Sequence, residues 1–327
     1  MESNPVFNQS RIDLTVLNEA VEKMRAEIGK IVVGQAEMVD LLIVALLADG
    51  HVLIEGVPGV AKTLTAKLMA KTFAVDFARI QFTPDLMPSD VLGTAVYNQQ
   101  KSEFEFKAGP IFSNIVLIDE INRSPAKTQA ALFEVMEERQ ITMDGTTYKM
   151  GYPFVVIATQ NPIEQEGTYR LPEAQLDRFL FKIEVGYPNL EEEEAIILGH
   201  HERKAQNPID LLTPVLDGNK LQDLRSQVHS ILLEPNLIKY IARIVNDTRE
   251  NPNLYLGASP RASIAILAAS KAMAAINGRD FVTPEDIKSV TPAVLAHRIV
   301  LTPEVEMEGT KPAEVVQEII RKIEVPR

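Results

Sequence analysis

The chain has 327 residues, of which 46% are hydrophobic and 24% charged, as in globular proteins with room for two ordinary domains. It contains no cysteine, which excludes disulfides and thiolate metal sites. Its 45 acidic and 33 basic residues give a net charge of −12, which disfavours general attraction to nucleic acid or anionic lipid.

The N-terminal part of the chain predicts two helices and no membrane segment. The first residues, MESNPVFNQS, lack the basic and apolar regions of a signal peptide, and the apolar run 41–48 is too short to span a bilayer. We therefore expect a cytoplasmic protein without membrane insertion. Apolar residues recur at spacings of three and four from Leu14 to Ile28, which predicts an amphipathic helix. Residues 37–48 are apolar on nearly every side and predict a buried helix.

Strands and helices then alternate along the chain. Short apolar runs predict strands at 51–55, 77–82, 115–119, 154–159 and 179–185. Helical patterns lie between several of them, notably at 63–72 and 126–138. This alternation predicts a parallel sheet covered by helices on both faces.

Two β-hairpins are expected to interrupt this alternation. One pairs residues 94–97 with residues 104–107. The other pairs residues 140–143 with residues 146–150 across Asp144–Gly145, a strong signal for a type I′ turn.

The character of the chain changes after Pro188. Strand-like runs largely vanish, and helices are predicted in the regions 221–231, 237–248, 262–276 and 313–323. Thr283 and Thr302 are each followed by proline and predict two further helix starts. We therefore expect an α/β core at 1–188 and an all-helical lid at 189–327.

The sequence GVPGVAKT, residues 56–63, has the context of a phosphate-binding loop because it follows a predicted strand and precedes a predicted helix. Glycines let backbone N–H groups surround phosphate oxygens, and the helix N-terminus adds a favourable dipole. Lys62 would reach the β- and γ-phosphates, and Thr63 would supply a hydroxyl to Mg²⁺. The residues expected to bind the nucleotide here are Gly56, Gly59, Val60, Ala61, Lys62, Thr63 and Leu64.

One position of this loop departs from the usual pattern. The pattern requires glycine where this chain has Ala61, and a methyl group is tolerable there if the residue has helical φ and ψ. The alternative to a nucleotide site is a tight strand-to-helix turn without a ligand.

Polar residues follow two of the predicted buried strands, at the end of a parallel sheet where ligands bind. Asp119 ends the run IVLID and would hold Mg²⁺, and Glu120 would polarise the attacking water. The alternative is that both acids cap the next helix. Asn161 follows the next strand and could orient the water or contact the γ-phosphate, although asparagine before proline is often a turn residue.

Together these segments resemble the AAA+ ATPases, and closely the MoxR family, over most of the chain from Val32 onward. The phrases that resemble MoxR proteins are HVLIEGVPGVAKT, RIQFTPDLMPSDVLG, LIDEINR, ATQNP, EGTYRLPEAQLDRF and GASPRA. Alanine at position 61 is usual in MoxR-like loops. The resemblance also implies that the two hairpins are the helix-2 insert and the pre-sensor-1 insert, shared with magnesium chelatase and MCM helicases.

The resemblance implies further site residues. Val33, Gly34 and Gln35 would lie near the adenine, and Asn161 would be sensor 1. Arg178 would be the arginine finger for a neighbouring subunit's nucleotide, and Arg261 would be sensor 2, reaching from the lid to the γ-phosphate. Alternatively, Arg178 forms only a local ion pair with Asp177 or caps a helix, with a similar structural role for Arg261. Arg123 could face the subunit interface, but we favour a structural role for it.

The resemblance implies a mechanism, Mg²⁺-dependent ATP hydrolysis between subunits of a homo-oligomeric ring, expected to be a hexamer that binds ATP and ADP. The client would be a protein with a von Willebrand factor A domain, and the outcome metal insertion or complex assembly. A nucleic-acid motor of the MCM type is one alternative. The acidic chain and the few basic hairpin residues, chiefly Lys101, Lys107 and Lys149, disfavour it. The other alternative is a scaffold that binds ATP with negligible turnover, which Glu120 argues against.

Overall fold

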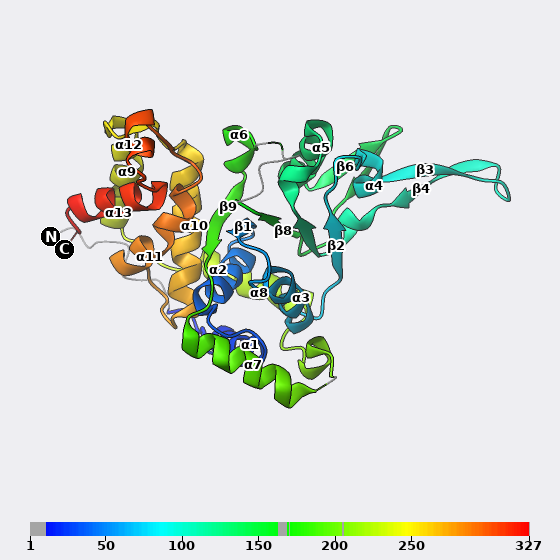
Figure 1. Cartoon of the computed structure of the whole chain (residues 1–327), viewed down its shortest axis with the longest axis horizontal. Coiled ribbons are helices and arrows are strands. Elements are labelled where there is room, and N and C mark those ends of the chain that lie inside the picture. The colour runs from blue at the N-terminus through cyan, green and yellow to red at the C-terminus, as the bar shows by residue number, and fades with distance from the viewer. Residues whose placement is uncertain (1–10, 163–168, 170, 205, 327) are drawn as a thin grey trace.

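The computed structural model describes residues 11–162, 169, 171–204 and 206–326, and its centre is a parallel five-stranded sheet (Figure 1). The strand order is β2-β5-β8-β1-β9. The strands are β1 (His51–Gly56), β2 (Phe77–Gln81), β5 (Ile115–Asp119), β8 (Val155–Gln160) and β9 (Phe179–Val185). The predicted strands and the α/β fold class are therefore confirmed, with strand ends that agree to within one residue.

Each face of the sheet is covered by its own apolar cluster. Val52 and Ile54 of β1 share one cluster with the helices α1 (Thr15–Gly29), α2 (Ala36–Leu47) and α3 (Lys62–Thr72). Leu53, the strand residue between them, belongs to the other cluster, with α5 (Ala126–Glu138). Because both faces are buried, the central strands β5 and β8 are apolar until their carboxyl ends rather than alternating.

Two hairpins project beyond the β2 edge of the sheet (Figure 1). They are β3 (Gly93–Asn98) with β4 (Glu103–Ala108), and β6 (Gln140–Met143) with β7 (Thr146–Lys149). Asp144 and Gly145 have φ of 50° and 78°, as a type I′ turn requires. Phe106 of β4 stacks on Tyr148 of β7, with ring centroids 4.3 Å apart, so the two hairpins contact each other.

Some short elements were not predicted. A helix α4 (Pro88–Leu92) precedes the first hairpin, and 3₁₀ turns occur at η2 (Pro110–Phe112), η3 (Ile121–Arg123) and η4 (Pro208–Leu211). A further helix, α6 (Glu173–Leu176), precedes β9. Elements of three to five residues are too short to show a hydrophobic period.

Helices dominate after Pro188, and α9 to α13 lie beyond the β9 edge (Figure 1). They are α7 (Leu190–Arg203), α8 (Gly218–His229), α9 (Pro235–Glu250), α10 (Pro260–Ile276), α11 (Pro284–Leu295), α12 (Pro303–Met307) and α13 (Pro312–Lys322). Thr283 and Thr302 are N-cap residues, as predicted. The expectation of an all-helical lid is corrected by a small antiparallel pair, β10 (Leu254–Leu256) with β11 (Val300–Leu301), too short for strand periodicity. Among the described residues, no helix is long and apolar enough to cross a membrane.

His51, at the start of β1, is a buried histidine that the fold keeps neutral. Its Nδ1 accepts a hydrogen bond of 2.9 Å from the Val156 backbone N–H, and its Nε2 lies 3.1 Å from the Met136 carbonyl oxygen. A proton added to Nδ1 would point at the Val156 N–H, so two hydrogen-bond donors would face each other. Burial, with a smaller effect of the Arg139 guanidinium, lowers the pKa of His51 to about 4.

We expect this histidine to make the fold sensitive to acid. In the unfolded chain its pKa lies near 6.5, so below that pH the unfolded state binds a proton that the folded state excludes. The contribution of His51 to the free energy of unfolding should therefore fall by up to about 3 kcal/mol as the pH drops from about 6.5 to 4. Urea denaturation at several pH values between 7 and 4.5 measures this slope. His51→Asn should flatten the slope and exposed His200→Gln should not; equal slopes in the two variants would contradict the assignment.

Candidate functional site

The loop between β1 and α3 has the backbone of a phosphate-binding loop. Gly59 has φ of 90°, a conformation that glycine adopts readily and residues with a β-carbon rarely do. Gly56 lies against β9, where a β-carbon would come 2.6 Å from the Val185 carbonyl oxygen. Helix α3 begins at Lys62, so its N-terminus faces the loop. Backbone donors and the helix dipole thus favour an anion at this place.

Ala61 does not have the right-handed helical φ and ψ that would make its methyl group tolerable in this loop. It has φ of 60° and ψ of 15°, in the left-handed rather than the right-handed helical region. A β-carbon in that region costs about 1–2 kcal/mol, so the loop stores backbone strain immediately before Lys62.

Lys62 and Thr63 lie at the mouth of the loop. The Lys62 ammonium donates a hydrogen bond to the Gly56 carbonyl, which holds its charge over the loop. The Thr63 hydroxyl lies 3.3 and 3.4 Å from the two carboxylate oxygens of Asp119, at the end of β5. The structure therefore brings together the predicted phosphate-binding and metal-binding residues.

Asp119 is a buried carboxylate with several donors around it. The Thr159 hydroxyl donates to its Oδ1 over 3.0 Å, and the Arg79 Nε donates to its Oδ2 over 2.6 Å. Only 6% of Asp119 is exposed, so these donors compensate for its lost hydration.

Glu120 points its carboxylate into the same region. Its Oε2 accepts a hydrogen bond of 2.8 Å from Gln81 Nε2 and lies 3.1 Å from Arg123 Nε. Glu120 occupies the N-cap position of η3 but makes no side-chain capping bond, so the helix-cap alternative is wrong for it. Arg123, for which the sequence favours a structural role, forms this ion pair from three residues further along the chain.

A cavity of about 360 Å³ joins these groups. Its lining residues are Pro58, Gly59, Ala61, Lys62, Thr63, Leu64, Arg79, Gln81, Asp119, Glu120, Thr159, Gln160 and Asn161. Sequence reasoning missed Arg79 and Gln81. Their spacing of two on β2 places both on one face of the strand, and Gln81 is in register with Asp119. This spacing is visible in the sequence, but it points to the site only once β2 is known to pair with β5.

The donor set of this cavity fits Mg²⁺. Magnesium takes oxygen ligands and is held at nucleotide sites by one or two protein oxygens together with phosphates. The Thr63 hydroxyl and the Asp119 carboxylate supply such oxygens side by side. Among the residues that the structure describes, no group of three or more histidine or acidic side chains offers a separate metal site.

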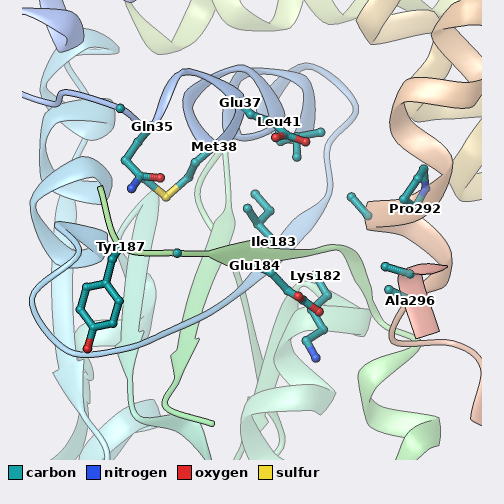
Figure 2. Close-up of a pocket in the computed structure, with 14 residues that line it drawn as sticks. Gln35, Glu37, Met38, Leu41, Lys182, Ile183, Glu184, Tyr187, Pro292 and Ala296 are labelled. Carbon is teal, nitrogen blue, oxygen red and sulfur yellow. The ribbon is translucent and has the colours of Figure 1, made fainter. Parts of the chain in front are cut away.

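A second cavity of about 340 Å³ lies between the start of α2, strand β9 and the lid (Figure 2). Gln35, just before α2, and Met38 on α2 line one side, Tyr187 follows the end of β9, and Pro292 on α11 and Ala296 just after it line the lid side. Gly34 also lines it. Val33 is not among the residues lining either cavity, and Val60 is buried in the core.

Arg178 and Arg261 lie together, but outside both cavities. Arg261 Nη2 lies 3.0 Å from Oε1 of Glu137 on α5, and Arg178 Nε lies 3.9 Å from Oε2 of the same carboxylate. Arg178 also donates to the Phe133 carbonyl. Asp177, the proposed local partner of Arg178, is instead bonded to Arg298 and Ser259 of the lid. The structure thus brings the two arginines to one carboxylate and not to their own phosphate loop.

The chain is similar to known ATPases in sequence and in structure. Residues 51–181 match the model for the ATPase family associated with various cellular activities (AAA), and residues 246–319 match the AAA lid domain. Chaperone MoxR1 of Mycobacterium tuberculosis is 44% identical over 94% of this chain and 82% of its own length. Protein MoxR of Methylorubrum extorquens is 30% identical over 95% of both chains. A crystal structure of a proposed ATPase from Cytophaga hutchinsonii superposes with a TM-score of 0.89 at 44% identity, covering 96% of this chain and 97% of that one.

Proposed function

We propose, from the premise that this chain belongs to the MoxR family of AAA ATPases, that it hydrolyses Mg²⁺-bound ATP between subunits of a hexameric ring and remodels a protein client. One observation carries this proposal. Lys62, Thr63, Asp119 and Glu120 come from two separate segments of the chain and converge on one cavity beside a phosphate-binding loop.

Each residue of this cavity has its own role in hydrolysis. Lys62 holds the β- and γ-phosphates, while Thr63 and Asp119 hold Mg²⁺, which neutralises phosphate charge when bound. Glu120 accepts a proton from the attacking water, and Gln81 and Arg123 fix its carboxylate for that purpose. Asn161, only 8% exposed at the end of β8, orients the water.

The second cavity is where we place the nucleobase. It includes Gly34 and Gln35, and its wall at Gly186 and Tyr187 follows Val185, the strand partner of Gly56. A nucleotide could therefore extend from this cavity to the phosphate loop.

Arg178 and Arg261 would act on the nucleotide of a neighbouring subunit. Both are directed to Glu137 rather than to their own cavity, and their side chains are 29% and 53% exposed. A contact that joins one subunit's arginines to another's phosphate loop uses two different surfaces, and such head-to-tail contacts close into rings.

The proposed client is a protein. The relative from M. tuberculosis is named a chaperone, which supports a protein client. Within that class we propose a protein with a von Willebrand factor A domain, assembled or loaded with metal in the cytoplasm. A nucleic-acid motor is less well supported, because Lys101 at the tip of the first hairpin is already paired with Glu105 at 2.5 Å. DNA binding measured at low salt separates the two classes.

We expect ATP turnover per subunit to rise with protein concentration and to require Mg²⁺, since each site is completed by a neighbour. Phosphate release measured from nanomolar to micromolar protein, alongside light scattering, tests this. Turnover that is independent of concentration while the mass increases would contradict hydrolysis between subunits. Negligible turnover in fully assembled rings would instead favour the scaffold.

A further inference from the structure

Asp177 joins the segment that carries Arg178 to the lid. Its Oδ1 accepts a hydrogen bond of 2.8 Å from Arg298 Nε, after the end of α11. Its Oδ2 accepts one of 2.9 Å from the Ser259 hydroxyl, before the start of α10. A single carboxylate therefore bonds to two separate parts of the lid.

Arg298 extends this connection along the start of β9. Its guanidinium also donates to the carbonyl oxygens of Asp177, Phe179 and Leu180, at 3.0, 2.6 and 3.1 Å. The side chain of Arg298 is only 3% exposed, so its positive charge needs the negatively charged partner that Asp177 provides. The backbone on both sides of Arg178 is thus held to the lid.

Ser259 makes the same connection for Arg261. It is the N-cap of α10 and accepts a hydrogen bond of 3.2 Å from the Arg261 N–H. The carboxylate of Asp177 therefore links, through Arg298 and Ser259, the backbone segments that carry Arg178 and Arg261. The two guanidinium groups meet at Glu137, which shows that the resulting spacing lets both reach one anionic group.

We propose that Asp177 is a positioning residue that fixes Arg178 and Arg261 as one unit, so that both reach the same nucleotide of the neighbouring subunit. This rests on the proposed hydrolysis between subunits. Asp177 contacts no nucleotide itself. Its effect comes from preorganisation, because donors held in place stabilise transition-state charge better than donors that must be ordered during the reaction.

The test combines Asp177→Asn with subunit mixing. The amide keeps the size of the side chain but not its charge, and a misplacement of catalytic groups by about 1 Å can lower kcat about 10²-fold. We expect kcat to fall by about one to two orders of magnitude with unchanged ATP affinity. Because the defect lies in what the subunit gives its neighbour, mixing with Lys62→Ala, whose arginines are intact, should recover activity. Exposed Asp223→Asn is the matched control.

The outcomes separate this inference from the function on which it rests. Normal kcat in Asp177→Asn, with turnover lost in Arg178→Ala, overturns the positioning role alone, whereas normal kcat in Arg178→Ala overturns hydrolysis between subunits. Recovery of the Arg178→Ala mixture but not of the Asp177→Asn mixture also overturns the positioning role.

If Asp177→Asn does not fold, Ser259 decides the question. Ser259→Gly should leave the start of α10 in place, since glycine is tolerated at an N-cap, but it lacks the hydroxyl that bonds to Asp177 and to the Arg261 N–H. We expect about a tenfold lower kcat, with wild-type kcat in Ser259→Thr, which retains the hydroxyl. Equal kcat in both Ser259 variants would overturn the proposal.

Discussion

Replacement of Glu120 by glutamine is expected to leave ATP affinity unchanged and to lower turnover about 10²–10⁴-fold, the usual contribution of a general base. Glutamine has the size of glutamate, and its carbonyl oxygen can still accept from Gln81. The variant loses the proton acceptor and the negative charge that pairs with Arg123. Calorimetric titration with ATP and a phosphate-release assay on the same preparation measure the two properties separately, and wild-type turnover in this variant would remove Glu120 from the mechanism.

Lys62→Ala is the complementary variant, because it should abolish ATP binding itself. It removes the ammonium that the loop holds through Gly56, and with it a point charge on the phosphates in the ground state. Lys71→Ala, near the end of the same helix, removes an equal charge far from the loop and should bind ATP normally. Equal affinity in Lys62→Ala and the wild type would show that the loop does not hold phosphate.

Arg178→Ala should lower turnover about 10³–10⁵-fold, the range that arginine fingers supply. The chain should still bind ATP, because Arg178 does not line the phosphate-loop cavity. Mixing Arg178→Ala with Lys62→Ala places an intact loop beside an intact arginine at some interfaces, and part of the activity should return. A residue that acts only within its own chain cannot give this result.

The control for this experiment is Arg243→Ala, an exposed arginine on α9. It should have wild-type turnover alone. A purely structural Arg178 would make a partly exposed contact with Glu137, worth about 0–1 kcal/mol of stability, and its loss would leave turnover nearly normal. Normal turnover in Arg178→Ala would therefore exclude the finger assignment. If only the mixture fails to recover activity, the evidence against the finger assignment is weaker, because a ring can need several intact sites to hydrolyse ATP.

The sequence was most informative where local chemistry and the fold require the same residues. Strands buried in a parallel sheet are apolar for most of their length, so the five strands could be located from the sequence, together with the acids Asp119, which ends β5, and Glu120, which follows it. The loop before Lys62 could be located because its glycine and lysine spacing serves phosphate binding directly.

Residues whose roles depend on the order of the strands could not be found in this way. Arg79 and Gln81 contact Asp119 and Glu120 only because β2 pairs with β5, and no local pattern gives that pairing. Arg178 and Arg261 share Glu137, although they lie far apart in the sequence, and no local pattern gives that proximity. The left-handed Ala61 is a further case, since the loop imposes a conformation that alanine alone disfavours.

The stack of Phe106 on Tyr148 has a mechanical consequence. A two-stranded ribbon standing alone bends easily, because nothing supports either of its faces. The stack joins two such ribbons into one thicker beam, and the β6–β7 ribbon follows directly on α5, separated from it only by Arg139. The exposed rings of Tyr97 and Phe104, 5.3 Å apart, lie on the outer half of this beam. Through this stack, a displacement at the end of α5 can pass from the β6–β7 ribbon to the β3–β4 ribbon that carries these rings.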